Sequence, residues 1–200
     1  MKSTKIISAV IILTAATFFI LHKVGVFDQR QRVLYNYGKE IEDAADKYDL
    51  NDAFLKALCV LESSGNKPSG FRFEKHVYKS LLKVKNKKGF KYGSITHNMI
   101  KDASDEALRN LATSWGPFQL MGYQCLQMGI HVKDIRGENG VEWSIKWINK
   151  NYGDYIRQNK FADAFHIHNR GIPVPKSRKY LTYNKKYVPS GLKLMEYYEN

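Results

Sequence analysis

Apolar residues recur at helical spacing along most of this 200-residue chain, and this periodicity constrains the fold more than any other feature. In the first such stretch, 33–48, the apolar side chains lie on one side of the expected helix and the acidic ones lie largely elsewhere. Further stretches lie at 52–65, 104–111, 117–126, 141–155 and 161–167, and an aromatic-rich segment closes the chain at 180–198. The sequence therefore predicts a mainly α-helical protein.

Two stretches depart from helical spacing. Residues 70–78 alternate enough to predict a strand or extended segment that enters a short helix, and residues 83–97 predict a loop or hairpin. The helix from Ser104 is expected to break at Ser114–Pro117, and Pro117 can begin the next helix because a first turn does not need its missing N–H. The sequence contains no internal repeat and no long linker, so we expect one helical domain with a small β or loop region at 28–200.

The N-terminus carries a separate signal. An uncharged stretch, Ile6–Leu21, follows Lys2 and Lys5 and is typical of a membrane-targeting segment. A cleaved signal peptide would end its apolar region in small residues, but here Thr14–Thr17 is followed by further apolar residues. The stretch is slightly shorter than the about 20 residues that span a bilayer comfortably. We expect residues 1–27 to form an N-terminal membrane helix, as an uncleaved anchor or signal-anchor.

The chain is strongly basic. Lysine and arginine outnumber the acidic residues 32 to 19, which gives a formal net charge of +13. Such a surface favours polyanions, and both nucleic acid and an anionic cell envelope meet that description. Zinc-finger, homeodomain and RNA-recognition signatures are absent from the sequence, so we expect no nucleic-acid partner. The densest basic run, Lys83–Lys91, is most simply interpreted as a solvated loop.

The cysteines and histidines predict no metal site and no cofactor. Cys59 and Cys125 lack the spacing of metal ligands, and the six histidines are not placed to complete a zinc site. Both cysteines lie inside apolar helical patterns, which favours small buried thiols. A disulfide between them stays open as an alternative if the protein is exported.

One acidic residue stands out for its place in a helix. Asn51 or Asp52 can cap the helix that should end near Gly65, so Glu62 falls in the last turn. Glu62 lies four residues after Leu58 and shares its apolar face. Burial and the negative end of the helix dipole both favour a protonated carboxyl group there. A glycosidase needs such a group, because its acid must keep a proton until it meets the glycosidic oxygen.

Four blocks of sequence, taken in order and spacing, resemble the N-acetylmuramidase family of the lysozyme-like superfamily, which includes phage endolysins and bacterial wall-cutting enzymes. The blocks are Leu61–Gly65, Phe73–Tyr78, Ala112–Tyr123 and Phe165–Gly171. They extend over most of the chain after the N-terminal segment. The resemblance implies an α+β lysozyme-like fold, and it implies peptidoglycan glycan strands as the partner.

The resemblance also implies catalytic roles. The family's glutamate in the first block is its catalytic acid, and that role carries over to Glu62. The second block has Lys75 where the family has arginine, and it leaves Glu74 as the second catalytic candidate. Glu74 could position a water, or it could be a structural partner of Lys75, Arg72 or His76.

The remaining blocks supply candidates for substrate binding. Ser114, Trp115, Gln119 and Tyr123 are expected to line the sugar cleft, because aromatic faces stack on sugars and amides bond their hydroxyl or acetamido groups. Related lytic transglycosylases have a Tyr-Asn-Ala-Gly block in the cleft. Here that block begins with His168 and Asn169, so we expect the turn to be kept and the contact to the sugar to change. Tyr187 and Val188 resemble, more weakly, a Tyr-Val pair of the same enzymes.

Taken together, the resemblance implies a peptidoglycan-degrading muramidase that cleaves between N-acetylmuramic acid and N-acetylglucosamine, in the setting of a phage endolysin. A lytic transglycosylase and a virion-associated wall-penetrating enzyme are the enzymatic alternatives. A basic, membrane-tethered envelope-binding protein is the non-enzymatic one. We expect a monomer whose catalytic domain lies on the periplasmic or outer side of a membrane, at the host inner membrane or in a virion.

Overall fold

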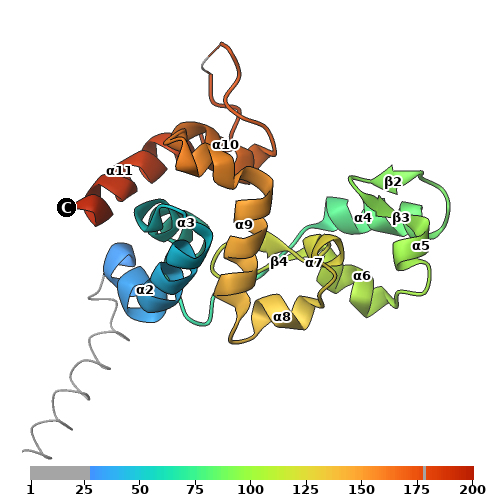
Figure 1. Cartoon of the computed structure of the whole chain (residues 1–200). Coiled ribbons are helices and arrows are strands. Elements are labelled where there is room, and N and C mark those ends of the chain that lie inside the picture. The colour runs from blue at the N-terminus through green and yellow to red at the C-terminus, as the bar shows by residue number, and fades with distance from the viewer. Residues whose placement is uncertain (1–27, 178) are drawn as a thin grey trace, which may run out of the picture.

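The computed structural model describes residues 28–177 and 179–200, and it divides into two lobes of unequal size (Figure 1). The larger lobe packs helices from both ends of the chain against one another. These are α2 (Gln29–Tyr48), α3 (Asp52–Ser63), α9 (Gly140–Arg157), α10 (Phe161–Arg170) and α11 (Tyr187–Glu199). The most extensive helix contacts join α3 to α11 and to α2. The helix that carries Glu62 is therefore covered by both neighbours.

The smaller lobe comprises residues 74–111 and has a core of its own (Figure 1). Its elements are α4 (Lys75–Lys85), β2 (Lys91–Tyr92), β3 (Ile95–Thr96), α5 (His97–Ile100) and α6 (Asp105–Leu111). The strands β2 and β3 form an antiparallel hairpin. Val77 and Leu81 of α4, Ile95 of β3 and Leu108 of α6 are buried together, so the hairpin is held against the helices by apolar packing.

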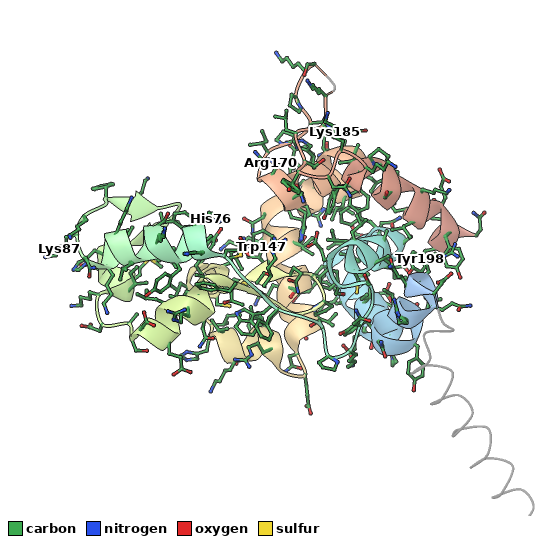
Figure 2. The ribbon with its side chains drawn as sticks, turned by 180° about the vertical axis from the view of Figure 1, so that it is seen from behind. His76, Lys87, Trp147, Arg170, Lys185 and Tyr198 are labelled. Atoms are coloured by element: carbon green, nitrogen blue, oxygen red, sulfur yellow. The ribbon has the colours of Figure 1, made fainter. Side chains whose placement is uncertain are left out.

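A three-stranded antiparallel sheet lies where the lobes meet. Its strands, in the order β1-β4-β5, are β1 (Arg72–Phe73), β4 (Thr113–Trp115) and β5 (Leu120–Met121). Two short helices, α7 (Gln124–Met128) and α8 (Val132–Arg136), lead from this sheet into α9. A small core cluster around Trp115 and Cys125 packs against Trp147 of α9, which Figure 2 shows between the two lobes.

Both ends of α3 form where the sequence supplies capping residues. Asn51 Oδ1 accepts a hydrogen bond of 2.7 Å from the Phe54 N–H, one of the amides that a helix leaves free at its start. At the other end, Ser64 and Gly65 adopt left-handed φ values of 55° and 69°. A Cβ on Gly65 would lie 2.7 Å from the Val33 nitrogen, so only glycine lets α3 end this close to α2.

The predicted mainly helical fold is confirmed, and so is a hairpin within residues 83–97, although α4 reaches Lys85. The helix predicted to begin at Pro117 is wrong, because Leu120–Met121 form β5 and the helix begins only at Gln124. The error has a tertiary cause: β5 pairs with β4, which pairs with the distant β1. The short helices α5 and α8 were not predicted.

The predicted membrane helix, residues 1–27, lies outside the described residues. Within the part of the chain that the structure describes, no helix combines the length and apolar character needed to cross a bilayer. Cys59 and Cys125 are both free and buried, so the alternative of buried thiols describes this structure.

Candidate active site

Glu62 occupies the last turn of α3 and points toward residues from the C-terminal part of the chain. Its side chain is 17% exposed. The Tyr187 hydroxyl, at the start of α11, donates a hydrogen bond to Glu62 Oε1. His168 Nε2, near the end of α10, lies 3.8 Å from the same oxygen. The structure therefore brings Glu62 and His168 together, as two of the residues that the sequence singled out.

The two carboxylate oxygens of Glu62 have different surroundings. Oε1 faces Tyr187 and His168. Oε2 makes no hydrogen bond with any residue that the structure describes, and it is not among the fully buried polar atoms that lack a partner. One oxygen is thus held by the protein, and the other is open to solvent or a ligand.

His168 makes a hydrogen bond through each of its ring nitrogens, and its neutral form is the one that burial favours. Its Nε2 lies 3.1 Å from the Phe118 carbonyl oxygen, which can only accept, so Nε2 carries a hydrogen. Its Nδ1 lies 2.6 Å from the Tyr152 hydroxyl, which donates to it. The side chain is only 7% exposed, so His168 lies beneath the site and not along an open surface.

The electrostatics of these groups agree with those hydrogen bonds. Burial lowers the pKa of His168, against the opposing effect of the nearby Glu62 charge. Burial also raises the pKa of Tyr152 and Tyr187 well above 10, and the Glu62 charge acts in the same direction. Near neutral pH, therefore, the histidine is uncharged and both tyrosines keep their hydroxyl protons.

Two structural features bring these partners to Glu62. Tyr152 has non-helical φ and ψ values of −152° and 19°, which interrupt α9 where its hydroxyl meets His168. The segment 171–186 connects His168 to Tyr187, and His166 binds it by contacts to the Ile172 carbonyl at 2.7 Å and the Leu181 N–H at 3.0 Å. The sequence predicted a helix over 141–155 and no site role for Tyr152, and only the weak Tyr-Val resemblance pointed to Tyr187.

Ser114, Trp115 and Gln119 come together on the β4–β5 hairpin. Gln119 Oε1 accepts a hydrogen bond of 2.8 Å from the Ser114 hydroxyl. Gln119 Nε2 donates to the carbonyls of Gly70 at 2.9 Å and Gly116 at 3.0 Å. The Gln119 amide thus finds its partners within the protein and fixes the hairpin. Through the Phe118 carbonyl, the same hairpin contacts His168.

Trp115 lies in the wall of a groove. Its Nε1 donates to the Asn110 carbonyl at 2.9 Å. The Phe71 ring lies 5.4 Å from its ring centroid, and the Arg136 guanidinium lies 4.3 Å above it. These residues border a groove of about 820 Å³ that α2 and the start of α9 complete.

The other predicted site residues lie elsewhere. Glu74 precedes α4, where its carboxylate lies 2.6 Å from Arg72 Nε and 3.5 Å from His76 Nδ1. Tyr123 packs edge-on against Tyr92 of the smaller lobe, with ring centroids 5.5 Å apart. Asn169 is exposed at the end of α10. Among the described residues, none of the three contacts Glu62.

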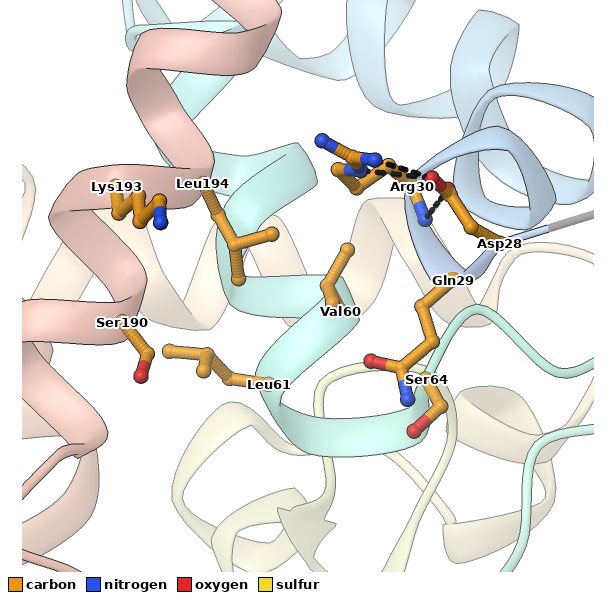
Figure 3. Close-up of a pocket in the computed structure, with 9 residues that line it drawn as sticks. All are labelled: Asp28, Gln29, Arg30, Val60, Leu61, Ser64, Ser190, Lys193 and Leu194. Carbon is orange, nitrogen blue, oxygen red and sulfur yellow. Dashed lines mark hydrogen bonds and ion pairs between the residues drawn. The ribbon is translucent and has the colours of Figure 1, made fainter.

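Another hollow, of about 530 Å³, lies between the start of α2, the end of α3 and α11 (Figure 3). Leu61 and Ser64 of the α3 end line it, together with Lys193 of α11 and the Asp28–Arg30 ion pair. None of the predicted site residues lines this hollow. Among the described residues, no group of three or more histidine, cysteine or acidic side chains is placed to hold a metal ion.

No protein-family model matches the chain, and no curated protein does. Among solved structures, the crystal structure of the Burkholderia AP3 phage endolysin matches it with a TM-score of 0.52. The chain shares its fold with a phage endolysin. The two proteins are 20% identical, and the match covers 80% of this chain and 70% of the endolysin chain. At this identity the likeness shows the fold alone, and that fold is consistent with the lysozyme-like one that the sequence predicted.

Proposed function

We propose that this protein is a peptidoglycan-degrading muramidase, with Glu62 as its general acid. The observation that carries the proposal is the environment of Glu62: a helix-end carboxyl group, largely shielded, with one oxygen held by Tyr187 and the other open. The endolysin fold of the chain supports a cell-wall substrate. The substrate bond is the one between N-acetylmuramic acid and N-acetylglucosamine.

In the reaction, Glu62 Oε2 gives its proton to the glycosidic oxygen, and the bond to the anomeric carbon breaks with its electron pair leaving on that oxygen. The Tyr187 hydroxyl already donates to Oε1, so it stabilises the carboxylate that remains. Neutral His168 neither competes for the proton nor adds a charge beside it. Water then adds to the sugar cation, its surplus proton is lost to solvent or to the Glu62 carboxylate, and a reducing end is left.

A lytic transglycosylase is the second candidate, and the surroundings of Glu74 favour it. The Glu74 carboxylate is engaged by Arg72 at 2.6 Å, so it is a poorer holder of water than a free carboxylate. Without a positioned water, the 6-hydroxyl of the muramic acid attacks its own anomeric carbon and forms an anhydro sugar. Mass spectrometry of the fragments separates the two outcomes, because the anhydro product is lighter by one water.

The substitution Glu62→Gln tests the acid itself. It keeps the shape of the side chain and removes the proton, so release of fragments from purified peptidoglycan should fall at least about hundredfold. Glu106→Gln, at an exposed position on α6, is the matched control and should keep full activity. Unchanged activity of Glu62→Gln with an unchanged thermal midpoint would leave the non-enzymatic envelope-binding function as the better explanation.

We also propose that residues 1–27 hold the enzyme at the periplasmic or outer face of a membrane. The uncharged stretch Ile6–Leu21 supports this. Membranes from cells that produce the full chain should retain it through a carbonate wash, whereas a chain that begins at Asp28 should be released.

A further inference from the structure

The smaller lobe carries an excess of positive charge, and its four acidic residues, Glu74, Asp102, Asp105 and Glu106, lie outside its lysine-rich segment. Residues 75–101 contain eight lysines and no aspartate, glutamate or arginine. Apart from Lys85, which donates to the Ala103 carbonyl at 2.5 Å, these lysines have side chains without a hydrogen bond or ion pair to any residue that the structure describes. Figure 2 shows Lys87 at the end of the lobe farthest from the C-terminal helix. The ammonium groups of Lys87 and its neighbour Lys88 therefore face solvent at one extremity of the molecule.

The loop between α4 and β2 is exposed, as the sequence predicted, and its first residues are hydrogen-bonded to the end of α4. The N–H groups of Asn86, Lys87 and Lys88 donate to carbonyls of the last α4 turns, at 3.0, 3.2 and 2.8 Å. His97 Nδ1 lies 2.9 Å from the Lys85 carbonyl and binds the loop to α5. The direction in which this loop points is thus set by the fold.

An exposed aromatic side chain lies next to these lysines in the sequence. Phe90 is 90% exposed, although it lies in an otherwise well-packed lobe. Together with Lys87 and Lys88 it borders a hollow of about 570 Å³. We use the name lysine tip for Lys83, Lys87, Lys88, Phe90 and Lys91. An exposed aromatic side chain next to unpaired lysine ammonium groups is typical of a surface that enters the headgroup region of a bilayer.

We propose that the lysine tip docks on an anionic lipid bilayer, with Phe90 between the headgroups and the lysines against lipid phosphates. The absence of acidic residues from 75–101 removes local repulsion from such a surface. The absence of arginine favours lipid over nucleic acid, because base and backbone recognition relies on the bidentate guanidinium, whereas lysine serves as a point charge toward a diffuse anionic layer.

The test measures an environment-sensitive label at the tip of the full-length chain. Asn86→Cys accepts the fluorophore nitrobenzoxadiazole, and the native Cys59 and Cys125 are buried and should not react. Vesicles of phosphatidylcholine with about a third phosphatidylglycerol should raise its emission several-fold, and vesicles of phosphatidylcholine alone should not. The same label at exposed Lys150→Cys on α9 is the control and should stay dim. This local readout does not depend on how residues 1–27 bind.

Two sets of variants identify the groups responsible. In K87E/K88E, the lipid concentration needed for a half-maximal rise in emission should increase by tenfold or more. Each lysine near the surface is worth about fivefold in affinity. Phe90→Ser should weaken it by roughly tenfold, and Phe90→Leu should restore most of the loss. K133E/K150E makes the same change in net charge at exposed positions of α8 and α9 and should have little effect.

Several outcomes overturn the proposal. Equal emission with the two vesicle types, or equal losses from K87E/K88E and K133E/K150E, would mean that the tip has no specific role. Salt-sensitive binding of duplex DNA or heparin by the tip, with dim emission on vesicles, would assign it to a polyanionic polymer. Activity on purified peptidoglycan should be unchanged in K87E/K88E, which separates this proposal from that for Glu62.

Discussion

At the scale of single residues, three neighbours of Glu62 keep their protonation states fixed near neutral pH. Burial raises the pKa of Tyr152 and Tyr187, and it lowers the pKa of His168. The hydrogen bonds run accordingly, from Tyr152 to His168 and from Tyr187 to Glu62. Around Glu62, therefore, the uncharged histidine and the two protonated tyrosines carry no charge of their own near neutral pH.

Tyr187→Phe tests the bond between Tyr187 and Glu62. The change removes the hydroxyl that donates to Glu62 Oε1 and leaves the ring in place. Because the hydroxyl stabilises the carboxylate left after proton transfer, the cleavage rate should fall about tenfold. The rate at which a cell-wall suspension clears measures it. Tyr183→Phe, at a fully exposed position, should clear at the original rate, and an undiminished rate in Tyr187→Phe would remove this role.

His168 makes stability depend on pH in a defined direction. Its pKa is lowered in the folded protein, so the unfolded chain binds the proton more tightly. The stability that this group contributes is full above its unfolded value of about 6.5, and it is lost as pH falls through the lowered folded value. Thermal midpoints should therefore drop between pH 7 and pH 5. His168→Gln should flatten that slope, and an identical slope in both proteins would contradict the assignment.

At the scale of elements, the sequence predicted what local patterns decide. The Asn51 cap, the apolar face and the Gly65 terminator placed Glu62 in the last turn of α3 before any tertiary contact was known. The β4–β5 hairpin was not predicted, because Phe118, Leu120 and Met121 have the spacing of a helix. The sheet, in which β4 pairs with both β5 and the distant β1, makes them a turn and a strand.

In the site, too, local sequence patterns predict some features and tertiary contacts decide the others. Glu62 follows from its own segment, but Tyr152 reaches it only because α9 is interrupted at that residue, which no local pattern signals. The sequence predicted a sugar contact for the Gln119 amide, and in the structure that amide bonds Ser114 and two backbone carbonyls. Whether a buried amide serves the substrate or the fold depends on neighbours that the sequence does not place.

The contact between α2 and α3 includes a lysine whose loss should be measurable. Lys56 is 8% exposed and bonds Glu42 and Asp52, each at 2.6 Å. Lys56→Met leaves these two carboxylates without their shared cation, so the free energy of unfolding should fall by about 1–2 kcal/mol. Urea denaturation measures it. Lys39→Met removes the exposed pair with Asp43 and should change stability by less than about 0.5 kcal/mol. Equal effects would contradict the distinction.

At the scale of the whole molecule, the two lobes have separate hydrophobic cores joined by a small third cluster. The large core around Leu58 and Phe165 belongs to the larger lobe, and the core around Leu81 and Leu108 belongs to the smaller one. The joining cluster of Trp115, Leu120, Cys125 and Ile135 packs beneath Trp147 of α9. Because it has few buried members, this cluster is the natural place for the structure to open first.

The two cysteines report on that order of opening. Cys59 lies in the large core and Cys125 in the joining cluster, and burial raises the pKa of both thiols to about 12. Neither should react with a thiol reagent at neutral pH until its surroundings open. In the single variants Cys59→Ala and Cys125→Ala, each remaining thiol can be followed alone in low urea. Cys125 should react faster than Cys59, since opening of the joining cluster exposes it while the large core stays packed. Equal rates would mean that the lobes and their junction unfold as one unit.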